Sequence, residues 1–363
     1  LLFRLAPVVF KESAKYSQWD VVNGILVPMN LEVHYNLLRS ELQYNIATAK
    51  SVSYSLGIWG QWDKRRATDP APEPSFGQWR QQELKRKGLF LESNKLLSNG
   101  GVFFCSLGYE EANIGGTAFV PFVSYNWKGG ASNRFRVSVG RNKLFPILDQ
   151  LFGAGCFIGN PSLRPSIANS LQLDWERTLP QGKLTASLFY SKYKDMIAND
   201  KDGVYYNIRK VREQGLEIAY EKNVANLSLW ANYTYLDSWD CDHDRALVSA
   251  YRTSEPKNTL KMGITVNGKR GLSYTAELFY WGKRVTDSEG WEWWYGAEGG
   301  PEQVLVPRSI SPATILNLKI SKQVGNGRSF SLSISNFFDK DWEEIIYYPQ
   351  AGRWFLFEFS QKF

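Results

Sequence analysis

The chain is poor in the side chains that build metal, redox and nucleophilic sites. It has only three cysteines and two histidines among 363 residues. No two cysteines form a Cys-x-x-Cys pair, and His34 and His243 stand far apart in the sequence. A zinc site needs several such ligands close together, and nucleophilic catalysis needs a nucleophile, a base and an orienting group in mutual reach. We therefore predict no catalytic residues, no metal site and no cofactor.

Long apolar runs are also missing. Nothing approaches the 18 or so consecutive apolar residues of a membrane-spanning helix, so no such helix is expected. The chain opens on Leu1-Leu2-Phe3-Arg4, with no initiator Met and no secretory signal pattern. We expect from this opening that the sequence lacks its natural beginning.

The charge pattern argues against nucleic acid as a partner, although the net charge is +7. Basic residues are spread along the chain, and the densest run, 80–87, lies in a strand-like segment. No nucleic-acid-binding motif accompanies them. Charged side chains on the polar faces and at the ends of strands explain the net positive charge. This charge also weakly favours anionic substrates or the phosphates of lipopolysaccharide.

The main positive signal is alternation of apolar and polar side chains. From Leu171 to Phe363 it forms nine runs of about ten residues, the length that a tilted strand needs to cross a bilayer. Apolar members that should share one face are Leu229, Ala231, Leu260, Ile264, Leu332 and Ile334. Polar members that should share the other face are Ser228, Lys261, Thr265, Ser331 and Ser333.

Short and long connections alternate between these runs. The short ones are 179–182, 223–226, 268–271 and 325–327, and the long ones are 198–206, 239–255, 286–311 and 339–352. This layout places all tight turns at one end and all long loops at the other, as in an outer-membrane β-barrel with external loops. A content of 15% aromatic residues suits two membrane interfaces. A large soluble all-β protein is the alternative that composition alone leaves open.

Residues before the nine runs continue the pattern. We predict further strands at 27–37, 41–48, 53–61, 82–91, 102–109, 118–126 and 134–141. The Pro-rich stretch 68–75 is a loop, and nothing suggests a linker. The expected fold is therefore all-β: an antiparallel transmembrane β-barrel with about 15–16 strands present, in one domain over residues 1–363.

Three passages resemble the carboxy-terminal half of TonB-dependent outer-membrane receptors. The first combines Ser138-Val-Gly-Arg, Phe145-Pro and Gly159-Asn-Pro-Ser-Leu-Arg-Pro165, with Ser166 where the family usually has an acid. The second is Ser335-Asn-Phe-Phe-Asp-Lys-Asp-Trp342, and the third is Pro349-Gln-Ala-Gly-Arg353. Physically these are turn-forming segments, so Asn160, Asn336 and Asp339 are expected to be architectural. The resemblance covers 134–363 well and the first 130 residues by pattern alone.

The resemblance implies a barrel of about 22 strands with an amino-terminal plug. On this basis the chain would be a partial receptor barrel that lacks the plug and about six strands. It implies active transport of a scarce chelate, of the ferric siderophore, haem or cobalamin type, across the outer membrane of a Gram-negative bacterium. The implied partners are outer-membrane lipid and lipopolysaccharide, the chelate, the insertion machinery, and the TonB complex through the missing plug. A passive porin-like channel of about sixteen strands is the alternative.

Two expected external loops carry the candidate ligand-binding residues. Exposed aromatic clusters often mark binding, and the richest one consists of Trp291, Trp293, Trp294 and Tyr295. The other loop starts at Trp239 and has three carboxylates at alternating positions, but it lacks the Gly and the terminal Glu of an EF-hand. The alternatives are that these rings form the outer aromatic girdle or fold onto one another to order a long loop. Cys156 and Cys241 also fall in expected external loops, and both a disulfide between them and free thiols remain open.

The last run of the chain has phenylalanines on one face. They are Phe355, Phe357, Phe359 and the terminal Phe363. A strand that ends in this way resembles the signal that the outer-membrane insertion machinery reads. Gln361 departs from the hydrophobic residue that is usual two positions before the end.

Overall fold

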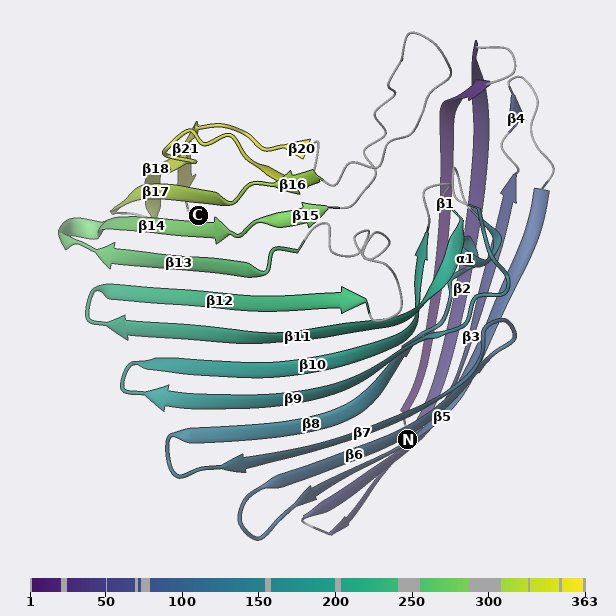
Figure 1. Ribbon diagram of the computed structural model, residues 1–363. Helices are drawn as coiled ribbons and strands as arrows, with labels where there is room; N and C mark the ends of the chain where they lie inside the picture. The colour runs from purple at the N-terminus through teal and green to yellow at the C-terminus, as the bar shows by residue number, and fades with distance from the viewer. Residues whose placement is uncertain are drawn as a thin grey trace. The chain divides into compact units, whose positions relative to one another are not determined.

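The computed structural model describes residues 2–20, 25–49, 51–68, 71–72, 79–153, 158–199, 204–240, 255–286, 308–325, 327–345 and 348–361. Nearly all of them lie in β-strands, which Figure 1 shows as long arrows. Sixteen of these strands are eight or more residues long. Among the described residues, no helix is long and apolar enough to span a membrane. The expectation of an all-β antiparallel chain with about 15–16 strands is confirmed.

Contacts divide the chain into two compact units. The first consists of Leu1–Tyr125, Ser138–Ser170 and Lys192–Lys210, and the second of Asn126–Val137, Leu171–Ser191 and Val211–Phe363.

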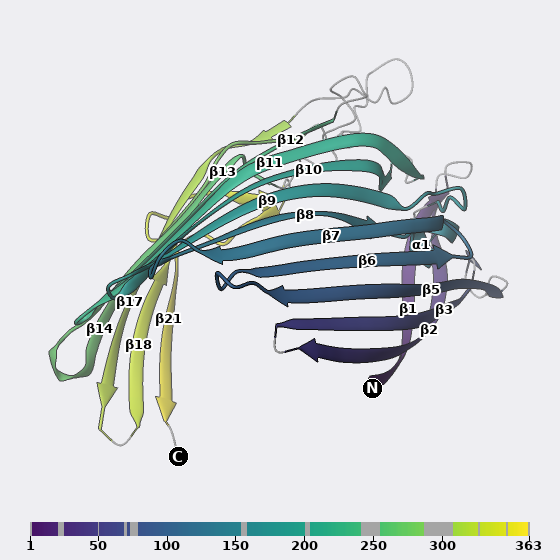
Figure 2. The ribbon, with the colours of Figure 1, turned by 90° about the horizontal axis from the view of Figure 1, so that it is seen from below.

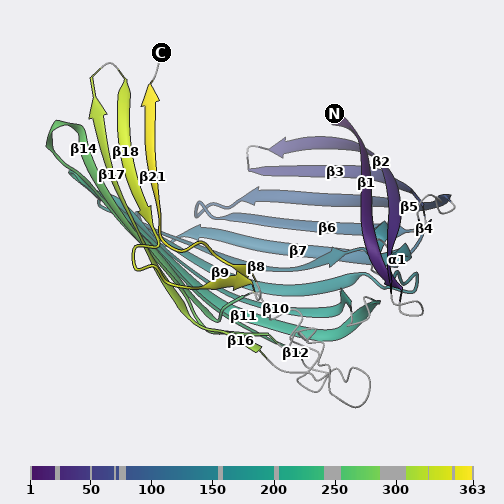
Figure 3. The same ribbon diagram turned by 90° about the horizontal axis from the view of Figure 1, so that it is seen from above.

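The first unit begins with five long strands, each antiparallel to the one before it. They are β1 (Leu2–Asp20), β2 (Ile25–Ala49), β3 (Val52–Thr68), β5 (Trp79–Leu96) and β6 (Val102–Ala112). Figures 2 and 3 show β3, β5 and β6 side by side in this order. A two-residue strand, β4 (Ala71–Pro72), pairs with Met29 and Asn30 of β2. The next strands along the chain are β7 (Gly116–Lys128) and β8 (Asn133–Leu144).

Two expectations for this region are wrong. The runs 27–37 and 41–48 are not separate strands, because β2 continues through both and pairs with β3 across the expected break, with Leu38 opposite Trp62 and Ser40 opposite Gly60. No Gly or Pro occurs there to turn the chain. Strand β1 was not expected, since Pro7 and the apolar stretch around it hide any alternation.

The connection between β8 and the next strand supplies the apolar core of the first unit. It carries the short helix α1 (Leu148–Phe152). Four of its apolar side chains pack against strand residues, and the cluster consists of Phe145, Leu148, Leu151, Leu163, Leu84, Ala112, Ala118 and Ile197. Burying these side chains removes apolar surface from water and fixes the connection to the strands.

The Gly-Asn-Pro sequence holds this connection in place. A Cβ at Gly159 would lie 2.1 Å from the amide nitrogen of Gly153, so only glycine fits. The side chain of Asn160 donates to the carbonyl oxygen of Tyr205 at 2.9 Å and accepts from the amide of Ser162 at 2.9 Å. The architectural role expected for Asn160 is confirmed.

The nine runs expected after Leu171 all form strands, and most of their residues belong to the second unit. The nine strands are β9 (Ser166–Leu179), β10 (Gly182–Asn199), β11 (Tyr205–Val224), β12 (Leu227–Asp240), β13 (Asn258–Asn267), β14 (Leu272–Trp281), β17 (Ala313–Val324), β18 (Arg328–Ser335) and β21 (Trp354–Gln361). From β11 to β21 each pairs antiparallel with the next in chain order. The four tight turns fall where the sequence predicts them.

The register gives these strands two distinct faces. One row across β12, β13, β14, β17, β18 and β21 consists of Leu229, Ile264, Ala276, Leu318, Ile334 and Phe355, and it defines the apolar face. The neighbouring row on the other side consists of Ser228, Thr265, Thr275, Lys319 and Ser333, and it defines the polar face. Ile264 is 39% exposed and Leu332 is 46% exposed, so the apolar face is not packed inside a core.

Candidate functional site

The polar face of β12–β14 carries a cluster of hydrogen-bonding and charged groups near the ends that lead into the long connections. Asn232 of β12 lies opposite Lys261 of β13, which lies opposite Phe279 of β14. One step nearer the long connections, the facing residues are Thr234, Thr259 and Trp281. Lys261 is exposed, and among the described residues no carboxylate forms an ion pair with it.

Four aromatic rings form a ladder along this part of the polar face. Trp230 and Phe279 have ring centroids 6.5 Å apart, and Phe279 stacks on Trp281 at 5.9 Å. Trp281 in turn stacks on Trp342 at 4.8 Å with an interplanar angle of 18°. Trp342 belongs to the connection between β18 and β21, so the ladder ties that connection to β14.

Arg284 joins the same connections. It begins the short strand β15 (Arg284–Thr286), which pairs with β16 (Arg308–Ile310). Its guanidinium donates to the carbonyl oxygens of Glu343, at 2.6 Å, and Glu344, at the start of β19 (Glu343–Ile345), which pairs with β20 (Tyr348–Pro349).

The side chain of Arg284 is buried. Only 1% of the residue is exposed, and its Nε atom has no hydrogen-bond partner among the described residues. Burial holds the pKa of Arg284 below its ordinary value, while the carboxylates of Glu344, Glu255 and Glu343 act in the opposite direction. Removing water from a charged group disfavours its charged form. The buried guanidinium of Arg284 has lost most of its contacts with water.

These groups surround a hollow of about 590 Å³. Its lining consists of Asn232, Thr234, Glu255, Pro256, Thr259, Lys261, Trp281, Arg284 and Glu344. The lining offers the exposed ammonium of Lys261, one amide, two hydroxyls and an indole face, together with a buried guanidinium and two carboxylates. The ammonium can contact an anionic group of a ligand, and the indole face can contact a planar one.

The described residues hold no group of three or more His, Cys, Asp or Glu side chains that could bind a metal ion directly. Cys105 is a free thiol on β6, and Cys156 and Cys241 lie outside the described residues.

The expected ligand-binding residues stay a prediction. Trp291, Trp293, Trp294 and Tyr295 lie outside the described residues, and Trp239 is described only through its backbone in β12. The sequence reasoning missed Trp281, Trp342 and Arg284. Aromatic residues at polar-face positions, as at 230, 279 and 281, were the available signal.

The expected barrel-assembly residues are described except for the last one. Phe355, Phe357 and Phe359 share the apolar face of β21 and lie opposite Ile334, Leu332 and Phe330 of β18. Phe357 is 67% exposed. Phe363 lies outside the described residues, so its role stays a prediction.

Comparison with solved structures shows the same fold. The chain matches a mutant of the ferric enterobactin receptor PfeA from Pseudomonas aeruginosa with a TM-score of 0.71 and 17% identity, covering 97% of this chain and 58% of that one. The siderophore receptor PirA from Acinetobacter baumannii matches with a TM-score of 0.73 and 15% identity, over 98% of this chain and 59% of that one. The copper transporter OprC matches with a TM-score of 0.72 and 14% identity, over 97% of this chain and 61% of that one. The chain thus spans about three fifths of the length of these proteins.

Comparison with protein families extends the resemblance toward the amino terminus. The sequence model described as TonB dependent receptor-like, beta-barrel, matches residues 12–337. This range includes most of the first 130 residues, which the motifs did not reach, and it ends before the passage 349–353. The chain belongs to the TonB-dependent receptor β-barrel family.

Proposed function

We propose that the chain forms the barrel wall of an outer-membrane importer for a metal chelate, driven through the TonB complex in the full-length protein. Family membership carries this proposal and favours an importer over a passive porin-like channel. The related structures named above are receptors or transporters for ferric enterobactin, a siderophore and copper. No enzymatic role is proposed.

Two features of the second unit support a membrane location. Its apolar face is exposed along several strands, as expected where a strand meets lipid. The opposite face carries hydrogen-bonded polar side chains, among them the ion pair between Lys319 and Glu358 at 2.9 Å. We propose that this polar face lines the interior of the barrel in the outer membrane of a Gram-negative bacterium.

The hollow on the polar face is the proposed contact site for the chelate. Lys261 supplies a cation for the negative charge of a deprotonated chelator, and Trp281 supplies a flat ring for a planar group. The loop aromatics Trp291, Trp293, Trp294, Tyr295 and Trp239 remain proposed contacts nearer the outside. Whether the chelate is a ferric siderophore, haem, cobalamin or a copper complex is left to experiment.

Uptake by the full-length protein tests this site. Screening labelled ferric siderophores, haem, cobalamin and copper first identifies the cognate chelate. Cells that carry the gene with Lys261→Ala should take up this chelate with an affinity lowered about tenfold, as expected for the loss of one charge-assisted contact. Lys269→Ala, which removes the same charge at a tight turn, should leave uptake unchanged. Equal uptake by both variants and the parent would contradict the assignment of the hollow.

A further inference from the structure

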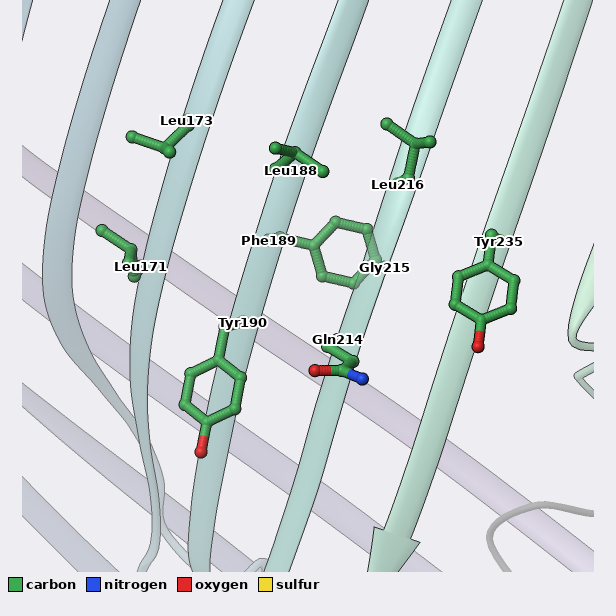
Figure 4. A pocket seen from close by; sticks show the side chains of 9 residues that line it. All are labelled: Leu171, Leu173, Leu188, Phe189, Tyr190, Gln214, Gly215, Leu216 and Tyr235. Atoms are coloured by element: carbon green, nitrogen blue, oxygen red, sulfur yellow. The ribbon is translucent and has the colours of Figure 1, made fainter.

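The apolar face of the second unit contains a groove over β9–β12. Its volume is about 300 Å³, and it is lined by Leu171, Leu173, Leu188, Phe189, Tyr190, Gln214, Gly215, Leu216 and Tyr235. Figure 4 shows these side chains on neighbouring strands. The volume is at the lower limit of ligand pockets, so the groove is large enough for a single hydrocarbon chain and too small for a bulky chelate.

The two walls of the groove differ in polarity. Leu173, Leu188 and Leu216 form one row across β9, β10 and β11 (Figure 4). The opposite wall has the hydroxyl of Tyr190 and the amide of Gln214. Between the walls lies Gly215, where a Cβ would meet the ring of Phe189 at 2.3 Å, so a side chain at this position would displace that ring.

The polar wall lies on the side of the long connections. Tyr190 is eight residues from the start of β10 at its tight turn, and Gln214 is ten residues from the end of β11 at the next tight turn. A strand crosses the hydrocarbon layer in about 9–11 residues. The groove therefore lies in the half of the span nearer the long loops, which face outward in outer-membrane barrels.

A positive charge lies beyond the polar wall. Arg212 precedes Gln214 by two residues on the same face of β11, roughly 7 Å away along the strand. Its Nε atom is buried and has no hydrogen-bond partner among the described residues. On the neighbouring strand β12, the carboxylate of Asp237 lies opposite Gln214 and is paired with Lys257 at 2.6 Å. The guanidinium of Arg212 is a positive charge at the polar end of the groove that can attract an anion.

We propose that the groove binds one acyl chain of lipid A, the phosphorylated lipid of the outer leaflet, with a phosphate at Arg212. The chain lies against the leucine wall, while the polar wall meets the ester and hydroxyl groups near the glycolipid head. Arginine suits a phosphate because its planar donors form two parallel hydrogen bonds. The inference rests on the outer-membrane location proposed above and assigns a lipid site that the transport function does not require.

Lipid binding by the full-length protein, purified in detergent, tests the proposal. Native mass spectrometry compares lipid A with its dephosphorylated form. The unmodified protein should bind one lipid A more tightly than the dephosphorylated lipid. Arg212→Gln should weaken lipid A binding about tenfold, the loss of one charge-assisted contact, and leave the dephosphorylated lipid unaffected. Lys222→Gln, at the tight-turn end of the same face of β11, should change neither.

A second pair of variants tests the groove itself. Leu216→Trp should fill it and weaken binding of both lipids, whereas Ile264→Trp, on the apolar face of β13, should not. Heat-modifiable mobility confirms that each variant folds. Equal losses for Arg212→Gln and Lys222→Gln, or for the two tryptophan variants, would overturn the proposal. Because the readout is lipid binding, a failure here leaves TonB-dependent uptake untouched, and a failure of uptake leaves lipid selectivity untouched.

Discussion

At the scale of single residues, Arg284 ties two long connections together at the end of the second unit. Its two donors satisfy the carbonyl oxygens of Glu343 and Glu344. The Trp281–Trp342 stack fixes the same connection from the polar face. Neither contact is visible in the sequence, because the partners are about 60 residues apart and meet only when the chain returns from β18.

Replacing Arg284 should loosen this connection. Arg284→Met keeps most of the side-chain volume but leaves two carbonyl oxygens without donors, which should cost about 1–3 kcal/mol of stability. We expect faster hydrogen exchange at Gln350, whose amide donates to the carbonyl of Trp342. Arg353→Met is the control, since that side chain is exposed on the same connection. Equal exchange rates in the two variants would count against the role of Arg284.

Ile264 tests which face meets lipid. It lies in the row of the apolar face and is 39% exposed. Ile264→Arg should lower the free energy of unfolding in lipid vesicles by about 2–4 kcal/mol if the residue lies near the bilayer midplane. Thr265→Arg, one residue along on the polar face, should cost much less. A larger penalty at Thr265 than at Ile264 would reverse the assignment of the faces.

At the scale of elements, the alternation of apolar and polar residues predicts which segments form strands better than it predicts where each strand begins and ends. The nine runs after Leu171 all form strands, because tight turns rich in Gly and Asn punctuate the pattern. The break expected inside β2 was wrong because pairing with β3 continued where local alternation weakened. The described parts of the long connections contain short strand pairs, such as β15 with β16, which gave no periodic signal in the sequence.

The turn motifs were interpreted correctly from their chemistry. Asn336 has a φ of 51°, accepts from the amide of Lys340 at 2.9 Å and donates to its carbonyl oxygen at 2.8 Å. Asp339 accepts from the amide of Arg353 at 2.6 Å. Asparagine and aspartate tolerate this backbone region and bond to it locally, so sequence was sufficient here.

Asn160 offers a test of such a motif in the first unit. Asn160→Ala removes both side-chain hydrogen bonds, to Tyr205 and Ser162, and should lower the free energy of unfolding by about 1–3 kcal/mol. Asn160→Asp keeps the acceptor for Ser162 and should lose less. Denaturant titration of the two variants in detergent measures the difference. An unchanged midpoint for Asn160→Ala would contradict the architectural role.

At the scale of the whole molecule, the chain belongs to the TonB-dependent receptor β-barrel family and spans 58% of the PfeA mutant. Length, periodicity and motif order were enough to identify the family, because a barrel repeats one strand unit many times. The hollow was not predictable, since it combines residues from strands and from separate connections.

Assembly of the full-length protein should depend on Phe363. Deleting Phe363 removes one aromatic residue of the expected insertion signal and should reduce the amount of heat-modifiable barrel in outer-membrane fractions. Deletion of Phe363 is compared with Phe363→Tyr, which keeps an aromatic residue at this position. Unchanged barrel levels after the deletion would show that Phe355, Phe357 and Phe359 suffice.

TonB-driven import is measured most directly as chelate uptake by cells that express the full-length protein, with and without a functional TonB complex. We expect saturable uptake of one class of metal chelate, which is lost when TonB is removed or the proton gradient is dissipated. Uptake of small solutes that is unsaturable and does not depend on TonB would contradict the proposed import and favour a passive channel.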